Sequence, residues 1–467
     1  MAISCPNTKL SKELNTLKVR DDSKILRFYA TDYEDEKKYT FIEGDSATWC
    51  SESQFTDIDL RKRIEPWLTS LFQSEHLALL VGSGLTTAIE REACGDSNNG
   101  MGAFTPKSRY KIQIEKKATE SVQLTCRGNT PNIEDYIRVM NELLAGLKIL
   151  DDAEAIEELS EEIDSVIKNF VANISNIENR IILANETTRT MAFNTLVLFL
   201  MSFASRTGTR DRLNIFTTNY DRLIEAAADI AGIRLIDRFV GSLTPIFRSS
   251  RMDIDMHYNP PGIRGEPRYL EGVVHYTKLH GSIDWVQSNN EIRKIGLPFG
   301  ALHIEPYLEA PGINASPSKT IIYPNASKDR ETSEYPFVEL FRDFAAALCR
   351  PNSTLVIYGY SFGDDHLNRI IRDMLTIPST HLIIIAYGDS NERIMDFYKR
   401  VGRPAQISLI IGPDIGNISS LVNCFLPKPS IDRTTIRMAD LLRQRYEQPH
   451  EPKKPQEGGD VNDNPTH

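Results

Sequence analysis

The sequence has few cysteines, and no two of them are close enough to form a Cys-x-x-Cys pair. The six stand far apart along 467 residues, at Cys5, Cys50, Cys94, Cys126, Cys349 and Cys424. A structural zinc site usually needs such closely spaced pairs, so the pattern argues against one and we expect no metal. Scattered single cysteines are typical of reduced thiols in a cytosolic protein, which predicts a cytoplasmic location.

Long hydrophobic runs are also missing. No apolar stretch reaches the roughly 18 residues that a membrane-spanning helix needs. The nearest is residues 191–204 (MAFNTLVLFLMSFA), which we interpret as a buried helix. The first residues show no basic start followed by an apolar run, so we expect no signal peptide and no membrane contact.

An excess of positive charge is absent as well. The chain has 54 Lys and Arg against 64 Asp and Glu, a formal net charge of -10. Affinity for nucleic acid comes mostly from basic side chains on phosphates, so we do not expect direct nucleic-acid binding to be the main role. The hydrophobic content of 40% is ordinary for a globular protein and sufficient for a large core.

Apolar runs that alternate with helical periods are the main structural signal. Helices are predicted at 57–72, 187–205 and about 336–349, and strands at 76–81, 213–218, 273–279, 320–323, 354–358, 381–387 and, more weakly, 407–412. This alternation predicts an α/β fold with a Rossmann-like, doubly wound parallel sheet, a helical insertion and no zinc module.

The pattern also predicts how the chain is divided. Residues 1–55 form an N-terminal arm or small hairpin, and 56–430 form the main domain. Residues 92–131 look like a loop or long excursion, and about 132–176 form a helical insertion. A helix at 431–446 and a disordered tail at 447–467, rich in Pro, Gly and charge, complete the chain. The acidic insertion is a solvated helical face or, alternatively, the surface for an oligomer or partner.

Unusual residues gather where the predicted strands end. Ligands of an open parallel sheet bind beyond the carboxyl ends of its strands, so these residues predict one shared pocket. They are the Gly82-Ser83-Gly84 turn, Asn219 and Asp221, His280, the segment 360–364 and Gly388-Asp389.

Each of these residues has a structural alternative. The glycine turn and Thr86 could approach a pyrophosphate or form a plain strand-to-helix turn, because the third glycine of the dinucleotide fingerprint is missing. Asn219 could cap a helix or orient a ribose or water, and Asp221 could secure the loop or take a ribose hydroxyl.

His280 precedes a glycine at a strand end, where a neutral imidazole suits a general base. We interpret the remaining histidines considered, His76, His275, His366 and His381, as packing or surface residues.

Four motifs together resemble the sirtuin-like domain, most closely the bacterial branch that degrades NAD in anti-phage defence. They are GSGLT (82–86), TTNYD (217–221), LHGSIDW (279–285) and GYSFGDD (359–365), and the resemblance spans about residues 60–430. It implies that Asn219 and His280 are catalytic and that NAD is the substrate. It also implies a pyrophosphate side at Gly82, Ser83, Gly84 and Thr86, with Asp221, Ser361 and Asp389 near the riboses or adenine.

Departures from the family pattern narrow the expected activity. Protein-deacylating sirtuins carry a four-cysteine zinc module and an Asp-Phe-Arg stretch after the glycine turn, and this chain has neither. The resemblance therefore implies an NAD glycohydrolase that depletes cellular NAD. The alternatives are an NAD-dependent protein deacylase and a non-catalytic NAD or ADP-ribose sensor.

The resemblance also implies control by assembly. An enzyme that empties a cell of NAD must stay silent until it is needed, so we expect a homo-oligomer and a partner chain. A HerA-type ring ATPase is favoured over a short Argonaute because no Argonaute-like module is fused here. This preference is an analogy and rests on no residue of the sequence.

Overall fold

The computed structural model describes residues 14–20, 22–31, 37–50, 54–98, 104–124, 131–204, 211–250, 255–258, 268–315, 319–322 and 335–428. The chain divides into two units, Met1–Pro427 and Lys428–His467, and the helices and strands of the described residues lie in the first of them. The predicted helix at 431–446 and the tail at 447–467 lie outside the described residues.

Seven parallel strands form the centre of the main sheet, which confirms the predicted α/β fold. In spatial order they are β18 Ile407–Ile411, β17 His381–Ala386, β16 Ser353–Tyr358, β5 His76–Val81, β6 Asn214–Thr217, β12 Val273–Lys278 and β7 Arg234–Ile236. The runs of Leu, Ile and Val in β5, β16 and β17 are buried on both faces, as expected for strands covered by helices on both sides.

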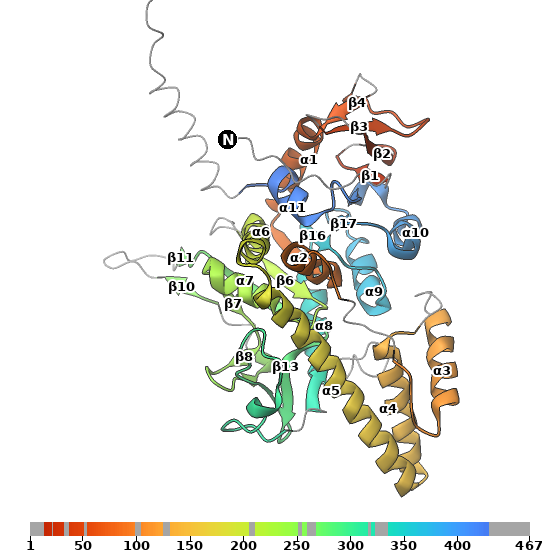
Figure 1. Ribbon diagram of the computed structural model, residues 1–467. Coiled ribbons are helices and arrows are strands. Elements are labelled where there is room, and N and C mark those ends of the chain that lie inside the picture. The colour runs from red at the N-terminus through yellow and green to blue at the C-terminus, as the bar shows by residue number, and fades with distance from the viewer. Residues whose placement is uncertain are drawn as a thin grey trace, which may run out of the picture. The chain divides into compact units, whose positions relative to one another are not determined.

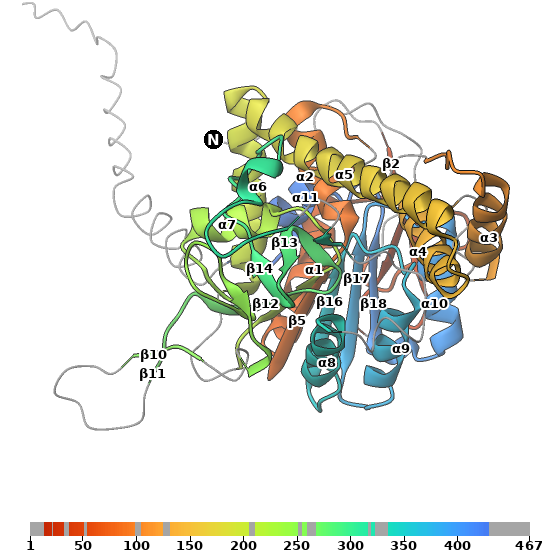
Figure 2. The same cartoon turned by 90° about the horizontal axis from the view of Figure 1, so that it is seen from below.

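Helices cover both faces of this sheet, so the fold is doubly wound (Figure 2). One core lies beneath α1 Asp57–Phe72, α2 Ser83–Cys94, α6 Glu186–Ala204 and α7 Leu223–Ala231. The other lies beneath α8 Phe337–Leu348, α9 Asp365–Met374 and α10 Arg393–Val401. Short helical turns are present at η2 Glu305–Tyr307, η5 Ser390–Glu392, η6 Pro404–Gln406, α11 Ile418–Ser420 and η7 Leu421–Phe425.

The order of the strands reverses at β5. From β5 the chain builds β6, β7 and β12 on one side, and then returns to β16 on the other side. Such a reversal leaves a crevice beyond the carboxyl ends of the two central strands, because the connections leave them in opposite directions. The crevice between β5 and β16 is therefore where this topology places a ligand site.

Four antiparallel strands extend the same sheet beyond β18. They are β1 Asn15–Lys18, β2 Leu26–Thr31, β3 Lys38–Phe41 and β4 Gln54–Thr56 (Figure 1). Thr16 pairs with Ile411 across the β1–β18 ladder, and the rings of Phe28, Tyr39 and Phe55 pack together behind the strands. The strands described within residues 1–55 thus belong to the main sheet, whereas the predicted domain boundaries stay predictions.

A second sheet contains the strand predicted at 320–323, which is a correction. The prediction took it as a strand of the parallel sheet, but β15 Thr320–Ile322 pairs antiparallel with β13 Gly281–Ser288. A short apolar run shows that a strand exists and does not show which sheet it joins. The remaining strands of this sheet are β14 Glu291–Lys294, β9 Ile246–Phe247 and β8 Phe239–Val240, and a separate pair is formed by β10 His257–Tyr258 and β11 Arg268–Tyr269.

The helical insertion consists of α4 Ile133–Ile149 and the long α5 Ala153–Leu183, with α3 Lys111–Leu124 packed against α4 (Figure 1). The prediction of a loop or long excursion over 92–131 did not include a helix, and the structure has α3 there. There Ile114, Ala118 and Val122 recur every four residues and are buried, although the polar composition around them conceals the period.

None of the helices within the described ranges is both long and apolar enough to cross a membrane.

Candidate active site

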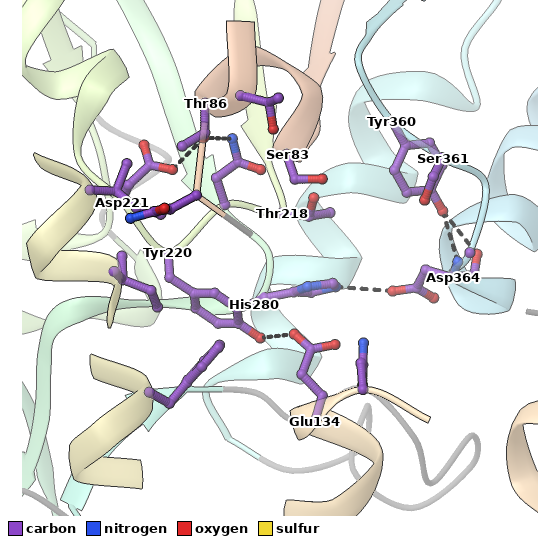
Figure 3. Close-up of a pocket in the computed structure, with 18 of the residues that line it drawn as sticks. Ser83, Thr86, Glu134, Thr218, Tyr220, Asp221, His280, Tyr360, Ser361 and Asp364 are labelled. Carbon is purple, nitrogen blue, oxygen red and sulfur yellow. Dashed lines mark hydrogen bonds and ion pairs between the residues drawn. The ribbon is translucent and has the colours of Figure 1, made fainter. Parts of the chain in front are cut away.

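A cavity of about 400 Å³ lies at the carboxyl ends of the central strands (Figure 3). One part of its lining, called here the sheet wall, comes from the loops that follow the parallel strands and from the first turn of α2: Ser83, Thr86, Asn219, Asp221, His280, Ser361 and Asp364. Another part, called here the insertion wall, comes from α4 and α5: Glu134, Asp135, Phe170, Ile174 and Ile177.

The glycine turn is packed directly against the loop that follows β16. Gly82 N donates to Tyr358 O at 3.0 Å, and Gly84 N donates to Gly359 O at 2.9 Å. A Cβ on Gly82 would lie 2.5 Å from Gly359 O, and Gly359 itself has a φ of +63°. These glycines therefore let two loop backbones meet at the reversal point. Neither Gly82 nor Gly84 lines the cavity, whereas Ser83 between them does.

Asn219, Thr86 and Asp221 form one hydrogen-bonded group. Asn219 Nδ2 donates to Gly82 O and to Thr86 Oγ1, both at 3.0 Å. Thr86 Oγ1 donates in turn to Asp221 Oδ2 at 2.6 Å, and Asp221 Oδ1 accepts from Leu223 N at 3.1 Å. Because Nδ2 donates both of these bonds, the orientation of the Asn219 amide is fixed. Its Oδ1 is therefore the atom that can accept a further hydrogen bond. Asp221 secures the loop, which is the first of the two roles considered for it.

His280 is paired with a buried carboxylate. His280 Nε2 lies 3.0 Å from Asp364 Oδ2, and both side chains are less than one-tenth exposed. Burial opposes ionisation of Asp364, but the hydrogen bond and charge of His280, with help from His366, outweigh it and lower the pKa of this carboxyl. An ionised partner fixes the proton on Nε2 and leaves Nδ1 as the basic nitrogen of the ring.

The insertion wall meets the sheet wall at Tyr220. Its hydroxyl donates to Glu134 Oε1 at 2.8 Å, and its ring centroid lies 6.3 Å from that of His280 (Figure 3). Phe170 packs edge-on against Tyr220 at 5.5 Å between centroids. Helix α4 begins here because Asn132 caps it, so that its first turn, with Glu134, enters the cavity.

A second connection between the walls is fully buried. Glu178 on α5 accepts from Arg222 N at 2.8 Å and from Arg222 Nη2 at 2.6 Å. It also accepts from Gly300 N at 3.2 Å. Burial lowers the pKa of Arg222, but the Glu178 carboxylate more than offsets this and raises it, which keeps the guanidinium charged. The loop that carries Asn219 is thereby tied to the insertion.

The cavity is rich in carboxylates. Among the described lining residues Arg393 is the one Lys or Arg, whereas the acids are Glu90, Glu134, Asp135, Asp221 and Asp364. Burial raises the pKa of Glu90, although the amide of Asn98 and the charge of Arg180 act against this. A ligand with a positively charged part suits such a lining better than a purely anionic one.

Of the nine residues predicted from sequence, six line this cavity: Ser83, Thr86, Asn219, Asp221, His280 and Ser361. Gly82 and Gly84 lie just behind it. Asp389 does not line it; its carboxylate accepts from Ile394 N at 2.8 Å and Met395 N at 3.0 Å at the start of α10. The ligand-binding roles assigned to all nine stay predictions.

The sequence analysis placed Asp364 in the predicted pocket, as the last residue of the segment 360–364, but gave it no role, and it missed Glu134. Asp364 stands in the quoted GYSFGDD motif after β16, and nothing in the sequence showed that it would pair with His280, which follows β12. Glu134 offered no signal, because an acidic residue in the first turn of a helix is ordinary there.

The part of the chain that holds most of these residues matches a known family. Residues 213–402 match the model of the SIR2-like domain family, a range that includes Asn219, His280 and Asp364. The match supports a sirtuin-like family and indicates an NAD-related, sirtuin-type function. Within the described residues, no group of three or more His, Cys, Asp or Glu is placed to hold a metal ion.

Comparison with solved structures adds little. One of them, from work on the structural basis of sirtuin substrate affinity, is 13% identical and covers 73% of this chain and 98% of its own. Its TM-score is 0.31, which is too distant a likeness to bear on the site. No curated protein matches the chain.

Proposed function

We propose that this protein is an NAD glycohydrolase that cleaves NAD to nicotinamide and ADP-ribose. The observation that carries the proposal is the pairing of His280 with the buried, ionised Asp364 in the cavity that Asn219 also lines. A histidine held in this way is oriented for proton transfer, as in a nucleophile-activating triad.

The reaction needs one bond to break and one to form. The bond between C1′ of the ribose and the nicotinamide nitrogen breaks, and the electron pair leaves with neutral nicotinamide. A water oxygen forms the new bond to C1′, and one proton is released. The transition state resembles an oxocarbenium ion, so buried carboxylates near it stabilise the developing positive charge.

His280 and Asn219 divide this work. His280 accepts a proton from a ribose hydroxyl through its basic nitrogen, and the carboxylate of Asp364 stabilises the imidazolium that forms. The ribose oxygen regains a proton from the attacking water, and His280 releases its proton to solvent as the one proton of the overall reaction. Asn219 offers its amide oxygen to the ribose or to the attacking water, because its nitrogen is held by Gly82 and Thr86.

The biological setting proposed for this activity is bacterial anti-phage defence, with depletion of cellular NAD. A HerA-type ring ATPase is the proposed partner, and the protein itself acts as a homo-oligomer. The resemblance of the four motifs supports this setting.

The test follows nicotinamide and ADP-ribose during incubation of the purified protein with NAD. It is run alone and with a candidate ring ATPase, with and without ATP and DNA. Asn219→Ala and His280→Ala are expected to lower turnover by about 100-fold or more. His303→Ala, at an exposed histidine, is the matched control and should leave it unchanged.

Survival of NAD in every mixture, although NAD binds, would overturn the proposal in favour of a sensor. Release of nicotinamide only in the presence of an acylated lysine peptide would instead indicate a deacylase.

A further inference from the structure

The insertion wall supplies no residue to the proton transfer described above, although it forms a large part of the cavity. It combines an aromatic ring and two aliphatic side chains, Phe170, Ile174 and Ile177, with the carboxylates of Glu134 and Asp135. The carboxylates lie on α4 and the apolar groups on α5. Its chemistry therefore differs from that of the sheet wall.

Charge decides which end of a dinucleotide such a wall can face. A pyrophosphate carries two negative charges and would be repelled by Glu134 and Asp135 in a poorly hydrated cavity. The oxidised nicotinamide ring is flat, mostly apolar and positively charged, so it is attracted both by carboxylates and by the face of an aromatic ring. The insertion wall thus suits the nicotinamide end, whereas Arg393 suits the phosphates.

Glu134 is held close to the reacting groups. Its Oε1 accepts from the hydroxyl of Tyr220, which directly follows Asn219 and whose ring lies 6.3 Å from that of His280. Glu134 is 5% exposed and Tyr220 is 4% exposed. A carboxylate in this position is fixed in direction and weakly screened by water, so its charge acts strongly on a neighbouring ligand group.

We propose that Glu134 is a specificity-determining residue that selects the carboxamide of nicotinamide. This inference rests on the proposed function, since it assigns the end of the NAD molecule that faces the helical insertion. A carboxamide carries an NH₂ group that donates to a carboxylate, whereas a carboxylate offers only acceptors. The same contact therefore favours NAD and disfavours its nicotinic-acid analogue, in which a carboxylate replaces the carboxamide.

The test compares NAD with nicotinic acid adenine dinucleotide as substrates of the full chain. The values of kcat/KM for both are measured in the unaltered protein, in Glu134→Gln and in Tyr220→Phe. Glu157→Gln is the matched control, because it removes an exposed carboxylate from α5, the other helix of the insertion. Glutamine keeps the shape of Glu134 while removing its charge.

The unaltered protein is expected to prefer NAD by about 100-fold, because the carboxylate of the analogue is repelled by that of Glu134. Glu134→Gln should reduce this preference by about tenfold, and Tyr220→Phe should reduce it less, since the hydroxyl only positions the carboxylate. Glu157→Gln should leave the preference unchanged. A merely structural role of Glu134 would lower turnover of both dinucleotides equally, which would overturn the proposal.

A binding measurement separates this inference from the proposed function. The dissociation constants of both dinucleotides are measured by calorimetry with His280→Ala protein and with the double variant His280→Ala, Glu134→Gln. Preference for NAD that falls in the double variant supports the role of Glu134 even if no NAD is hydrolysed. Equal binding of the two dinucleotides by His280→Ala protein overturns it even if NAD is hydrolysed.

Discussion

The two walls of the cavity are built in different ways. The sheet wall consists of short loops and the first turn of α2, and their side chains bond to one another, as in the group of Asn219, Thr86 and Asp221. The insertion wall consists of two helices that reach the site from outside the sheet and contact it through Tyr220 and Arg222. The residues proposed for proton transfer thus lie on the sheet wall, whereas the residue proposed to select the ligand lies on the helical insertion. Changes at the junction and within each wall should therefore have separable effects.

The largest effect is expected at the junction itself. Glu178→Gln leaves the guanidinium of Arg222 buried without a counter-charge, which should lower the free energy of unfolding by about 3–5 kcal/mol. Urea denaturation measures this change. Glu157→Gln on the exposed side of the same helix is the control, with an expected change below about 0.5 kcal/mol. If the two variants unfold alike, the insertion is not anchored through this pair.

Within the sheet wall, Asp364→Asn should lower kcat for NAD by about 100-fold, because the imidazolium of His280 loses its counter-charge. Stability should change little, since asparagine also caps the start of α9. Steady-state kinetics and a melting curve of the same sample separate the two effects. Asp373→Asn, exposed on that helix, should behave like the unaltered protein. Full activity of Asp364→Asn would show that the carboxylate of Asp364 has no role in the reaction.

A site that belongs to neither wall should make the fold sensitive to acid. Burial, aided by the charge of Lys18, lowers the pKa of His381 from 6.5 to about 4. Between these pH values the unfolded chain binds a proton that the native protein does not, so stability falls as the pH falls, by about 2 kcal/mol. Urea midpoints at pH 7 and pH 4.5 measure the loss, and His381→Gln should reduce it. An unchanged pH dependence in this variant would assign the loss to other groups.

The smallest effect is expected from Thr86→Val, which removes the hydroxyl shared by Asn219 and Asp221. Loss of these bonds should cost about 1 kcal/mol of stability and lower turnover by about tenfold through a less ordered Asn219. Thr86→Ser keeps the hydroxyl and should restore both. Failure of serine to restore turnover would mean that the methyl group, and not the hydrogen bonds, orders the loop.

The difference between the sheet wall and the insertion wall also explains which parts of the site could be predicted from the sequence. Strands such as His76–Val81 are continuous apolar runs, and the rule that ligands bind at strand ends is enough to place Asn219 and His280 in one pocket. Both signals are local or follow from topology. The sheet wall could therefore be predicted in large part.

The insertion wall could not be predicted, because its contacts depend on how two helices are placed. Glu134 and Tyr220 are 86 positions apart, and no periodicity indicates that they meet. The prediction that placed β15 in the parallel sheet failed for a similar reason, since a strand of three residues fits either sheet. The prediction for Asp389 shows how a local bond competes with ligand binding. A carboxylate just before a helix can bond the nearby backbone amides, which here are those of Ile394 and Met395.

The pairing of β1 with β18 has a consequence for the synthesis of this protein. Asn15 donates to Asp414, 399 positions later, so β1 cannot pair with β18 until the intervening residues have been synthesised. At about 5–20 residues per second, that wait is roughly 20–80 s. The loop that packs against the glycine turn likewise leaves the ribosome long after it, since Gly84 donates to Gly359. A nascent chain therefore lacks a complete cavity until β16 and the residues that follow it have been synthesised.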